Sequence, residues 1–266
     1  MGKKNRADAP GRLTVHKGDR IVFFMSTITL PSGRIRAKSS PFSRNAFVKC
    51  LKELTGTSFT GYLAVTVTEK LFLLFIFQGR PYAAGLSVGE KPAPLTITNF
   101  CAQIASVSEG SGIFSLHETD PVLLKCLLVF IQEEPAAKGS VNLINLKGMI
   151  NQIKSDTSDA LVILEDSGKF NFFFFLEGTK TAAYWSDVEN TSNKKLSVDE
   201  QMLMYACRDA AKPIDAIIYQ TLDTMESCDS ANMTLEGLVR LFSDSDDGNK
   251  ASVSTGDLLT ASDPLV

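Results

Sequence analysis

The feature that most constrains this chain is an internal repeat. Shifting the sequence by 99 residues places Ala46–Leu86 on Asn145–Trp185 without a gap. Within that register apolar residues meet apolar residues, Gly79 meets Gly178, and an Ala-Ala pair recurs. The stripe Phe47, Cys50, Leu51, Leu54 falls on Leu146, Met149, Ile150, Ile153, with the i, i+3, i+4, i+7 spacing of an amphipathic helix. The sequence therefore predicts two copies of one supersecondary unit.

Each unit is predicted to hold a helix, three strands and a second helix. In unit one these are Phe42–Leu54, Thr60–Val67, Leu71–Gln78, Tyr82–Leu86 and Thr98–Val107, then a short strand Ile113–Leu116. In unit two they are Leu143–Ile153, Ala160–Glu165, Phe170–Leu176, Thr181–Trp185 and Val198–Ala210, then Ile214–Gln220. The expected fold class is α+β, with two tandem repeats packed on each other, each with a three- to four-stranded antiparallel sheet.

The predicted domain boundaries follow from the repeat and from charge. Residues 1–40 form a basic arm that ends in a hairpin of Ile21–Thr29 and Gly33–Lys38, joined to the first sheet. Residues 41–138 are unit one, and residues 139–242 are unit two. Residues 243–266 are rich in Ser, Asp, Gly and Thr, and are predicted to be a disordered acidic tail.

The middle strand of each unit is apolar on both faces. A strand with one wet face alternates apolar and polar residues, but Leu71–Phe77 and Phe172–Phe175 do not alternate. Both faces must therefore be covered, one by the unit's own helices and the other by the sister unit. A ligand cavity or an exposed partner surface is the alternative for the second face.

Charge and cysteine content narrow the setting. The chain carries a net charge of −3, whereas residues 1–40 hold nine Lys and Arg against two acids. We interpret this arm as solvated, because it shows no nucleic-acid-binding motif. The five scattered cysteines are interpreted as buried thiols of a reducing compartment. No secretory signal and no apolar run long enough to cross a membrane is recognised, so a cytoplasmic location is expected.

Several positions of unit one resemble the PATAN-type domain. They are the helix with Leu51 and Leu54, the apolar strand before Phe77-Gln78-Gly79, the pair Ala83-Ala84, and Gly112-Ile113-Phe114. Unit two repeats part of this pattern. PATAN-type domains occur at the N-terminus of PatA-like response regulators and in related bacterial signalling proteins. The resemblance implies a non-enzymatic interaction module, duplicated here, in bacterial motility or surface signalling.

The search for catalytic chemistry finds one nucleophile-like motif. Gly85–Gly89 has the G-x-S-x-G spelling of a hydrolase elbow, but the prolines that follow predict a loop around Ser87 rather than a strand-to-helix turn. His117 beside Glu118 and Asp120 could transfer protons, but a solvated or capping role is favoured. Two histidines and no C-x-x-C spacing argue against a metal site. We therefore expect no catalytic, cofactor-binding or metal-binding residues.

Three aromatic residues are the candidate partner-binding residues. Tyr82, Tyr184 and Trp185 fall at or near the ends of third strands, where an exposed ring could anchor a partner. The leading hypothesis is a signalling adaptor or scaffold that binds a protein partner and no nucleic acid, with a homo-oligomer left open. The competing hypothesis is a sensor that binds an apolar small molecule between the Phe-rich sheets.

Overall fold

The computed structural model describes residues 28–31, 33–88, 91–186, 196–208, 212, 214–220, 222 and 233–243. The basic arm before Ile28, Cys228 and the acidic tail after Ser243 lie outside these ranges. The described elements, in chain order, are β1 (Arg34–Pro41), α1 (Arg44–Leu54), β2 (Gly61–Val67), β3 (Lys70–Phe77), β4 (Arg80–Val88), β5 (Ala93–Leu95), α2 (Ile97–Ala105), β6 (Ile113–Glu118), α3 (Pro121–Gln132), β7 (Ala137–Ser140), α4 (Leu146–Asp156), β8 (Ala160–Asp166), β9 (Lys169–Leu176), β10 (Thr179–Tyr184), α5 (Val198–Ala206), β11 (Asp215–Gln220) and α6 (Leu235–Ser243).

The two sheets share one order of five strands, and β5 is an additional edge strand of the first sheet. The first is β1-β6-β2-β3-β4-β5 and the second, read from its opposite edge, is β7-β11-β8-β9-β10, with antiparallel neighbours throughout. The α+β class and the duplicated architecture predicted from the repeat are confirmed. Strand β1 matches the predicted strand Gly33–Lys38. The sheets are wider than predicted because of the short edge strands β5 and β7: β5 contains Pro94, and β7 has little apolar content.

Fine geometry recurs in the register of the repeat. A bulge interrupts β4 between Pro81 and Ala83, and the same irregularity interrupts β10 between Lys180 and Ala182. The β3–β4 and β9–β10 turns also make matching hydrogen bonds. Gly79 N–H donates to the Phe59 carbonyl at 2.8 Å and Gly178 N–H to the Ser158 carbonyl at 3.0 Å. Gln78 N–H donates to Thr60 Oγ1 at 3.2 Å and Glu177 N–H to Asp159 Oδ1 at 2.9 Å. Each pair is related by the 99-residue shift.

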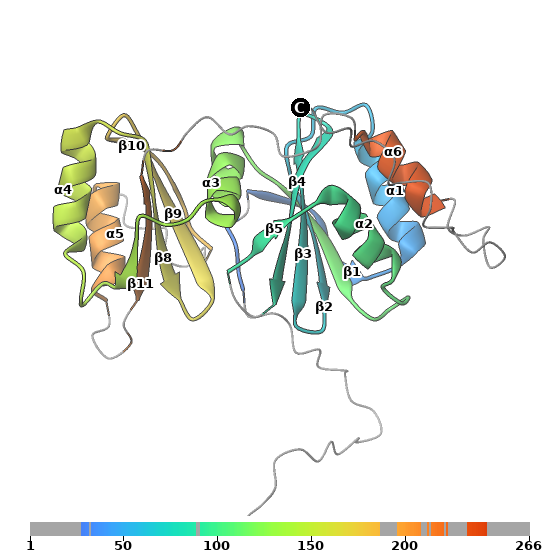
Figure 1. Cartoon of the computed structure of the whole chain (residues 1–266), viewed down its shortest axis with the longest axis horizontal. Helices are drawn as coiled ribbons and strands as arrows, with labels where there is room; N and C mark the ends of the chain where they lie inside the picture. The colour runs from blue at the N-terminus through green and yellow to red at the C-terminus, as the bar shows by residue number, and fades with distance from the viewer. Residues whose placement is uncertain are drawn as a thin grey trace, which may run out of the picture.

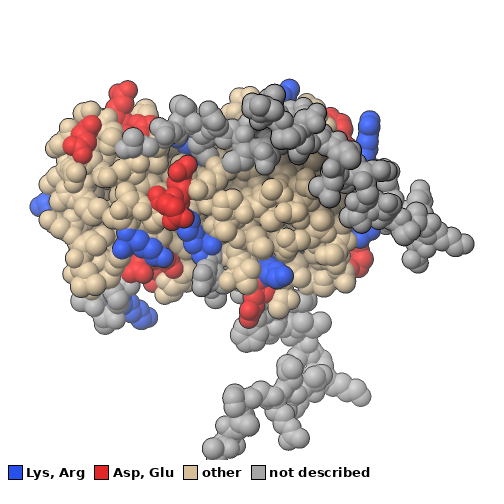
Figure 2. All heavy atoms as spheres, in the orientation of Figure 1, with Lys and Arg blue, Asp and Glu red and all other residues tan. Residues whose placement is uncertain are grey.

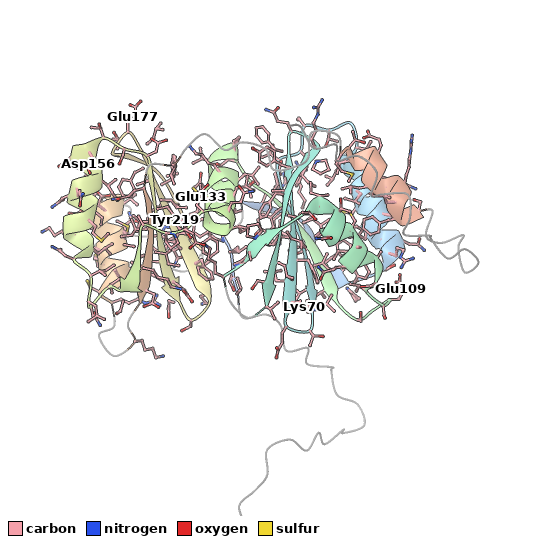
Figure 3. The ribbon with its side chains drawn as sticks, viewed as in Figure 1. Lys70, Glu109, Glu133, Asp156, Glu177 and Tyr219 are labelled. Carbon is pink, nitrogen blue, oxygen red and sulfur yellow. The ribbon has the colours of Figure 1, made fainter. Side chains whose placement is uncertain are left out.

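These turns sit against the ends of the leading helices. In Figure 3 Glu177, in the β9–β10 turn, and Asp156, at the end of α4, lie at the same end of the unit. A Cβ on Gly178 would lie 2.9 Å from the carbonyl oxygens of Ile153 and Lys154, and φ there is +69°. Only glycine fits such a close approach without strain, which explains why the glycine recurs in both units.

The molecule is built in five layers (Figure 1). Helices α1, α2 and α6 cover the outer face of the first sheet, α3 lies between the two sheets, and α4 and α5 cover the outer face of the second. Three apolar cores fill the spaces between layers. The central core joins inner residues of both sheets, such as Leu73 and Phe172, to α3.

Both faces of the middle strands are buried, as predicted, but α3 lies in the layer between the two sheets, where direct packing of the sister units was expected. Phe173 is fully buried against α4 and α5, whereas its neighbour Phe174 is 3% exposed in the central core. In β3, Leu73 faces the central core and Leu74 the outer one. Alternate side chains of a strand point to opposite faces, so a sheet covered on both sides selects an unbroken apolar run.

Helix α3 was not predicted from the sequence. Asp120 caps it by accepting the Val122 and Leu123 N–H groups at 2.9 Å, and Pro121 occupies its first turn. Residues from Leu123 to Ile131 are almost all apolar and buried. A helix packed between two sheets is apolar nearly all round and shows no clear helical stripe, which hides it from pattern analysis.

The N-terminal hairpin is not formed by the described residues. Strand β1 pairs with β6 in the first sheet, but Thr29 bridges to Lys169 in the second. Thr29 N–H donates to the Gly168 carbonyl at 2.7 Å, and the Tyr62 hydroxyl donates to the Pro31 carbonyl at 3.3 Å. The described residues Thr29 and Pro31 therefore tie the two sheets together, and residues 21–27 of the predicted hairpin lie outside the described residues.

Two elements depart from the predicted unit boundaries. Helix α6 lies at the end of the predicted second unit and includes Ser243, the first residue of the predicted tail, but its Leu235, Leu238 and Phe242 are buried in the outer core of the first unit. Strand β7 begins at Ala137, before the predicted boundary at residue 139, and pairs with β11 of the second sheet. The second unit thus starts with its edge strand, as the first starts with β1.

Candidate partner-binding surfaces

The three candidate aromatic residues occupy two different layers. Tyr82 and Tyr184 are half-buried at the margin of the central core, whereas Trp185 packs at the outer core of the second unit. The Tyr82 and Phe77 ring centroids are 6.1 Å apart, and the Trp185 ring lies 5.1 Å from Phe173. The structure does not bring the three rings together, and it gives each an intramolecular contact.

Tyr184 fastens the second sheet to α3. Its hydroxyl donates to Asp120 Oδ1 at 2.8 Å, the same carboxylate that caps the helix. Burial, together with this hydrogen bond, raises the pKa of the Tyr184 phenol. A second tie lies on α3, where Lys125 Nζ is 3.6 Å from Asp159 Oδ2. Both contacts position the units relative to each other.

Ser87 has no nucleophile geometry. The residue lies within β4 rather than in the predicted loop, and it is 1% exposed. A hydrolase elbow needs a turn between a strand and a helix that lifts the hydroxyl out of the sheet. Here Ser87 is paired with Leu71 across the ladder and is closed off inside the sheet, while Gly89 lies outside the described residues.

His117 and the two acidic residues near it in sequence, Glu118 and Asp120, contact different groups. The His117 ring stacks on Tyr62 with centroids 4.7 Å apart, and its Nε2 lies 2.8 Å from Ser115 Oγ. Burial lowers the pKa of the imidazole to about 4, so it is neutral at pH 7 and a weak base. Glu118 instead accepts hydrogen bonds from the Arg36 guanidinium, and the Asp120 carboxylate caps α3. The proton-transfer cluster considered from the sequence is not assembled.

The cysteine prediction holds for three residues. Cys50, Cys101 and Cys126 are buried, and burial raises the thiol pKa of Cys50 and Cys101 to about 11. Cys207 is exposed, which corrects the prediction for that residue. It follows the last turn of α5, where the helical stripe no longer faces the core.

An open groove of about 590 Å³ runs between α1 and the β1–β6 edge of the first sheet. Its apolar lining comes from α1, the loop after it and β6, and its charged lining from β1, α1 and the end of β6. The apolar lining includes Cys50, Leu54, Phe59, Phe114 and Leu116, and the charged lining is Arg36, Lys49, Glu53 and Glu118. The sequence analysis missed this groove, because it arises from where α1 crosses the sheet.

The charges at the groove are arranged in two pairs. Arg36 Nε lies 2.6 Å from Glu118 Oε2, and a second guanidinium N–H donates to Glu118 Oε1 at 2.9 Å. The Arg36 contact lowers the pKa of the Glu118 carboxyl. On α1, Lys49 and Glu53 are 4.0 Å apart, and their side chains are 78% and 67% exposed. Lys49 and Glu53 are therefore free to contact a partner.

The exposed Lys49–Glu53 pair at the groove has no counterpart in the second unit. The 99-residue shift places Gly148 at the position of Lys49 and Gln152 at that of Glu53. The sequence could have supplied this signal, because a charged pair at i, i+4 that is lost in the sister repeat marks a difference in use between two otherwise matched helices.

The face of the molecule shown in Figure 2 carries Lys and Arg interspersed with Asp and Glu, with an uncharged area on the side of the first unit. Helix α2, with the sequence ITNFCAQIA, contains no charged residue. Lys91 Nζ donates to the Glu133 carbonyl at 2.9 Å and lies 5.5 Å from the centroid of the Tyr219 ring. Figure 3 shows Tyr219 between the second sheet and α3. No continuous basic surface is visible on this face.

Within the described residues, no group of three or more His, Cys, Asp or Glu side chains is arranged to hold a metal ion. In the same part of the chain, no helix combines the length and apolar character needed to span a membrane.

Comparisons with known proteins supply no family. No family model matches the sequence, and no curated protein matches it. Among solved structures, the H. pylori beta clamp in complex with 5-chloroisatin aligns with 79% of this chain and 68% of its own, at 11% identity and a TM-score of 0.13. A TM-score this low carries no argument about the fold or function of this chain.

Proposed function

We propose that this protein is a non-enzymatic scaffold whose groove beside α1 receives a segment of a protein partner. The observation that carries the proposal is the anatomy of the groove, with an apolar lining of Leu54, Phe59 and Phe114 beside exposed charges. Protein interfaces combine an apolar centre with a polar rim. The PATAN-type resemblance extends the proposal to bacterial motility or surface signalling, and the scattered thiols support a cytoplasmic location.

The competing proposal, a sensor for an apolar small molecule, needs space between the Phe-rich sheets. That layer is occupied by α3, whose Phe130 ring lies 4.9 Å from Phe170 and 5.6 Å from Phe172. Phe172 and Phe174 are at most 3% exposed. Tight ring packing at this position favours the scaffold, because a ligand would have to displace core side chains.

Quantitative affinity capture from the native cells tests the scaffold. The double variant Lys49→Glu/Glu53→Lys keeps an i, i+4 ion pair but reverses the charges along the groove. The control is Gln152→Lys, at the position in unit two that corresponds to Glu53. We expect mass spectrometry to identify a protein captured by the wild type and by the control but at least tenfold depleted with the double variant. Equal capture by all three proteins would contradict the proposed groove.

Native mass spectrometry of the purified wild-type protein tests the sensor. The scaffold proposal predicts a mass equal to that of the polypeptide. A co-purifying apolar molecule, lost on Phe172→Trp substitution in the central core, would favour the sensor instead.

A further inference from the structure

A second candidate interface lies on the helical face of the first unit that α6 covers. Helix α6 comes from the far end of the chain and lies alongside α1 (Figure 1). Its buried residues Leu235, Leu238 and Phe242 follow i, i+3, i+7 spacing, and the Phe242 ring meets Phe47 edge-on at 5.1 Å between centroids. Glu236 and Arg240 are exposed on its outer side. This is the geometry of an amphipathic helix lying in an apolar groove.

The fold of the repeat does not require α6. In the second unit, α4 and α5 cover the sheet, and the described residues place no third helix on them. The two sheets nevertheless share the same order over five strands. Helix α6 is therefore an addition to a unit whose architecture is complete without it.

The surface beneath α6 is adapted to receive a helix. Val48 of α1 is 8% exposed and belongs to the core cluster that contains Leu238 and Phe242. The residue at the corresponding position of the second unit is Lys147, which is exposed. Nearby, Lys154 of α4 forms an ion pair with Asp199 of α5. The second unit thus presents charge to solvent where the first presents apolar side chains to α6.

Helix α6 is also short. It spans nine residues, with Thr234 Oγ1 accepting the Gly237 N–H at 3.1 Å near its start. Isolated helices of this length are marginal in water, so α6 forms because the face of α1 and α2 buries one side of it. A longer helix with the same apolar pattern would bury more area on the same face and compete with it.

We propose that the face of α1 and α2 covered by α6 is a docking site for an amphipathic helix of a partner protein, and that α6 is its intramolecular competitor. The partner helix carries large apolar residues at i, i+3 and i+7 and charged residues on the opposite side, as α6 does. This site is separate from the groove lined by Lys49 and Glu53. The proposal made for it does not depend on that groove.

Peptide binding to the full chain tests the competition. The probe is a fluorescently labelled peptide of residues 233–243, and the protein variant is Leu238→Glu, which places a charge on the buried side of α6. The matched control is Leu241→Glu on the same helix, because Leu241 is 52% exposed. We expect the peptide to bind the Leu238→Glu protein at least tenfold more tightly than it binds the wild type or the Leu241→Glu control. Equal affinity for all three proteins, or no binding to any, would overturn the proposal.

A second variant covers the case in which Leu238→Glu does not fold, judged by circular dichroism. A specific protease site is inserted after Ser230 in the wild-type sequence, and the chain is cleaved in its folded state. We expect the labelled peptide to replace the cleaved α6 fragment, whereas a fragment that never exchanges would show that α6 is a fixed part of the core.

Light scattering tests whether a second copy of the chain supplies the helix. Wild-type dimers that the Leu238→Glu substitution abolishes would mean that it does, which also overturns the partner proposal.

Discussion

Adjacent side chains of β9 contribute to different cores, because Phe173 faces α4 and α5 and Phe174 faces α3. We expect Phe173→Ala and Phe174→Ala each to lower the free energy of unfolding by about 3–5 kcal/mol, the usual cost of truncating a buried Phe. Leu176→Ala, on the same strand but 45% exposed, should cost less than about 1 kcal/mol. Urea unfolding of the three variants measures these differences. A Phe variant as stable as Leu176→Ala would show that its face is open.

His117 should make stability depend on pH. In the folded protein burial lowers the pKa of the imidazole from 6.5 to about 4, so between these values the unfolded chain binds a proton that the folded chain does not. Stability is therefore complete above pH 6.5 and falls as the pH is lowered through this window. The loss between pH 7.5 and pH 5 should be about 2 kcal/mol. His117→Gln, which cannot titrate, should flatten the urea-unfolding profile over that range, and an unchanged slope would contradict the assignment.

Two turn glycines, Gly79 and Gly110, differ in how closely other backbone atoms approach them. A Cβ on Gly79 would lie 2.0 Å from the Thr57 carbonyl oxygen, at φ +75°, whereas one on Gly110, at φ +72°, meets open space. Gly110→Ala should cost only the left-handed backbone penalty of about 1–2 kcal/mol. Gly79→Ala should cost clearly more, because the Thr57 backbone must also move. Thermal unfolding gives the comparison, and equal costs would contradict the observed approach of the turn to the end of α1.

The sequence predicted elements well where one periodicity dominated. The stripe from Phe47 to Leu54 gave α1, and the unbroken apolar runs gave β3 and β9 with both faces covered. It did not reveal α3, which is apolar all round, or β5, whose Pro94 argues against a strand except at a sheet edge. Helix α6 has a clear apolar stripe, but its contact with Phe47 joins residues far apart in the sequence, so no local pattern predicts it.

At the scale of the whole molecule, the candidate surfaces were less predictable than the fold. Tyr184 was selected as an exposed anchor, but its hydroxyl holds Asp120 at the start of α3. The groove forms where α1 and the loop after it meet β1 and β6, a tertiary property that Lys49 and Glu53 do not encode locally. Repeats reveal architecture through shared positions, whereas binding surfaces lie where the copies differ, as Val48 differs from Lys147.

The two units share one buried layer around α3, so they should unfold together, and urea unfolding followed by two probes measures whether they do. Trp185 is the single tryptophan and packs at the outer core of unit two, so its fluorescence reports on that unit, whereas far-UV circular dichroism reports on the whole chain. We expect coincident transitions for the wild type. The Leu73→Ala substitution, in unit one and facing the shared layer, should lower both midpoints together. A Trp185 transition that stays in place while the dichroism curve splits in two would contradict the shared layer.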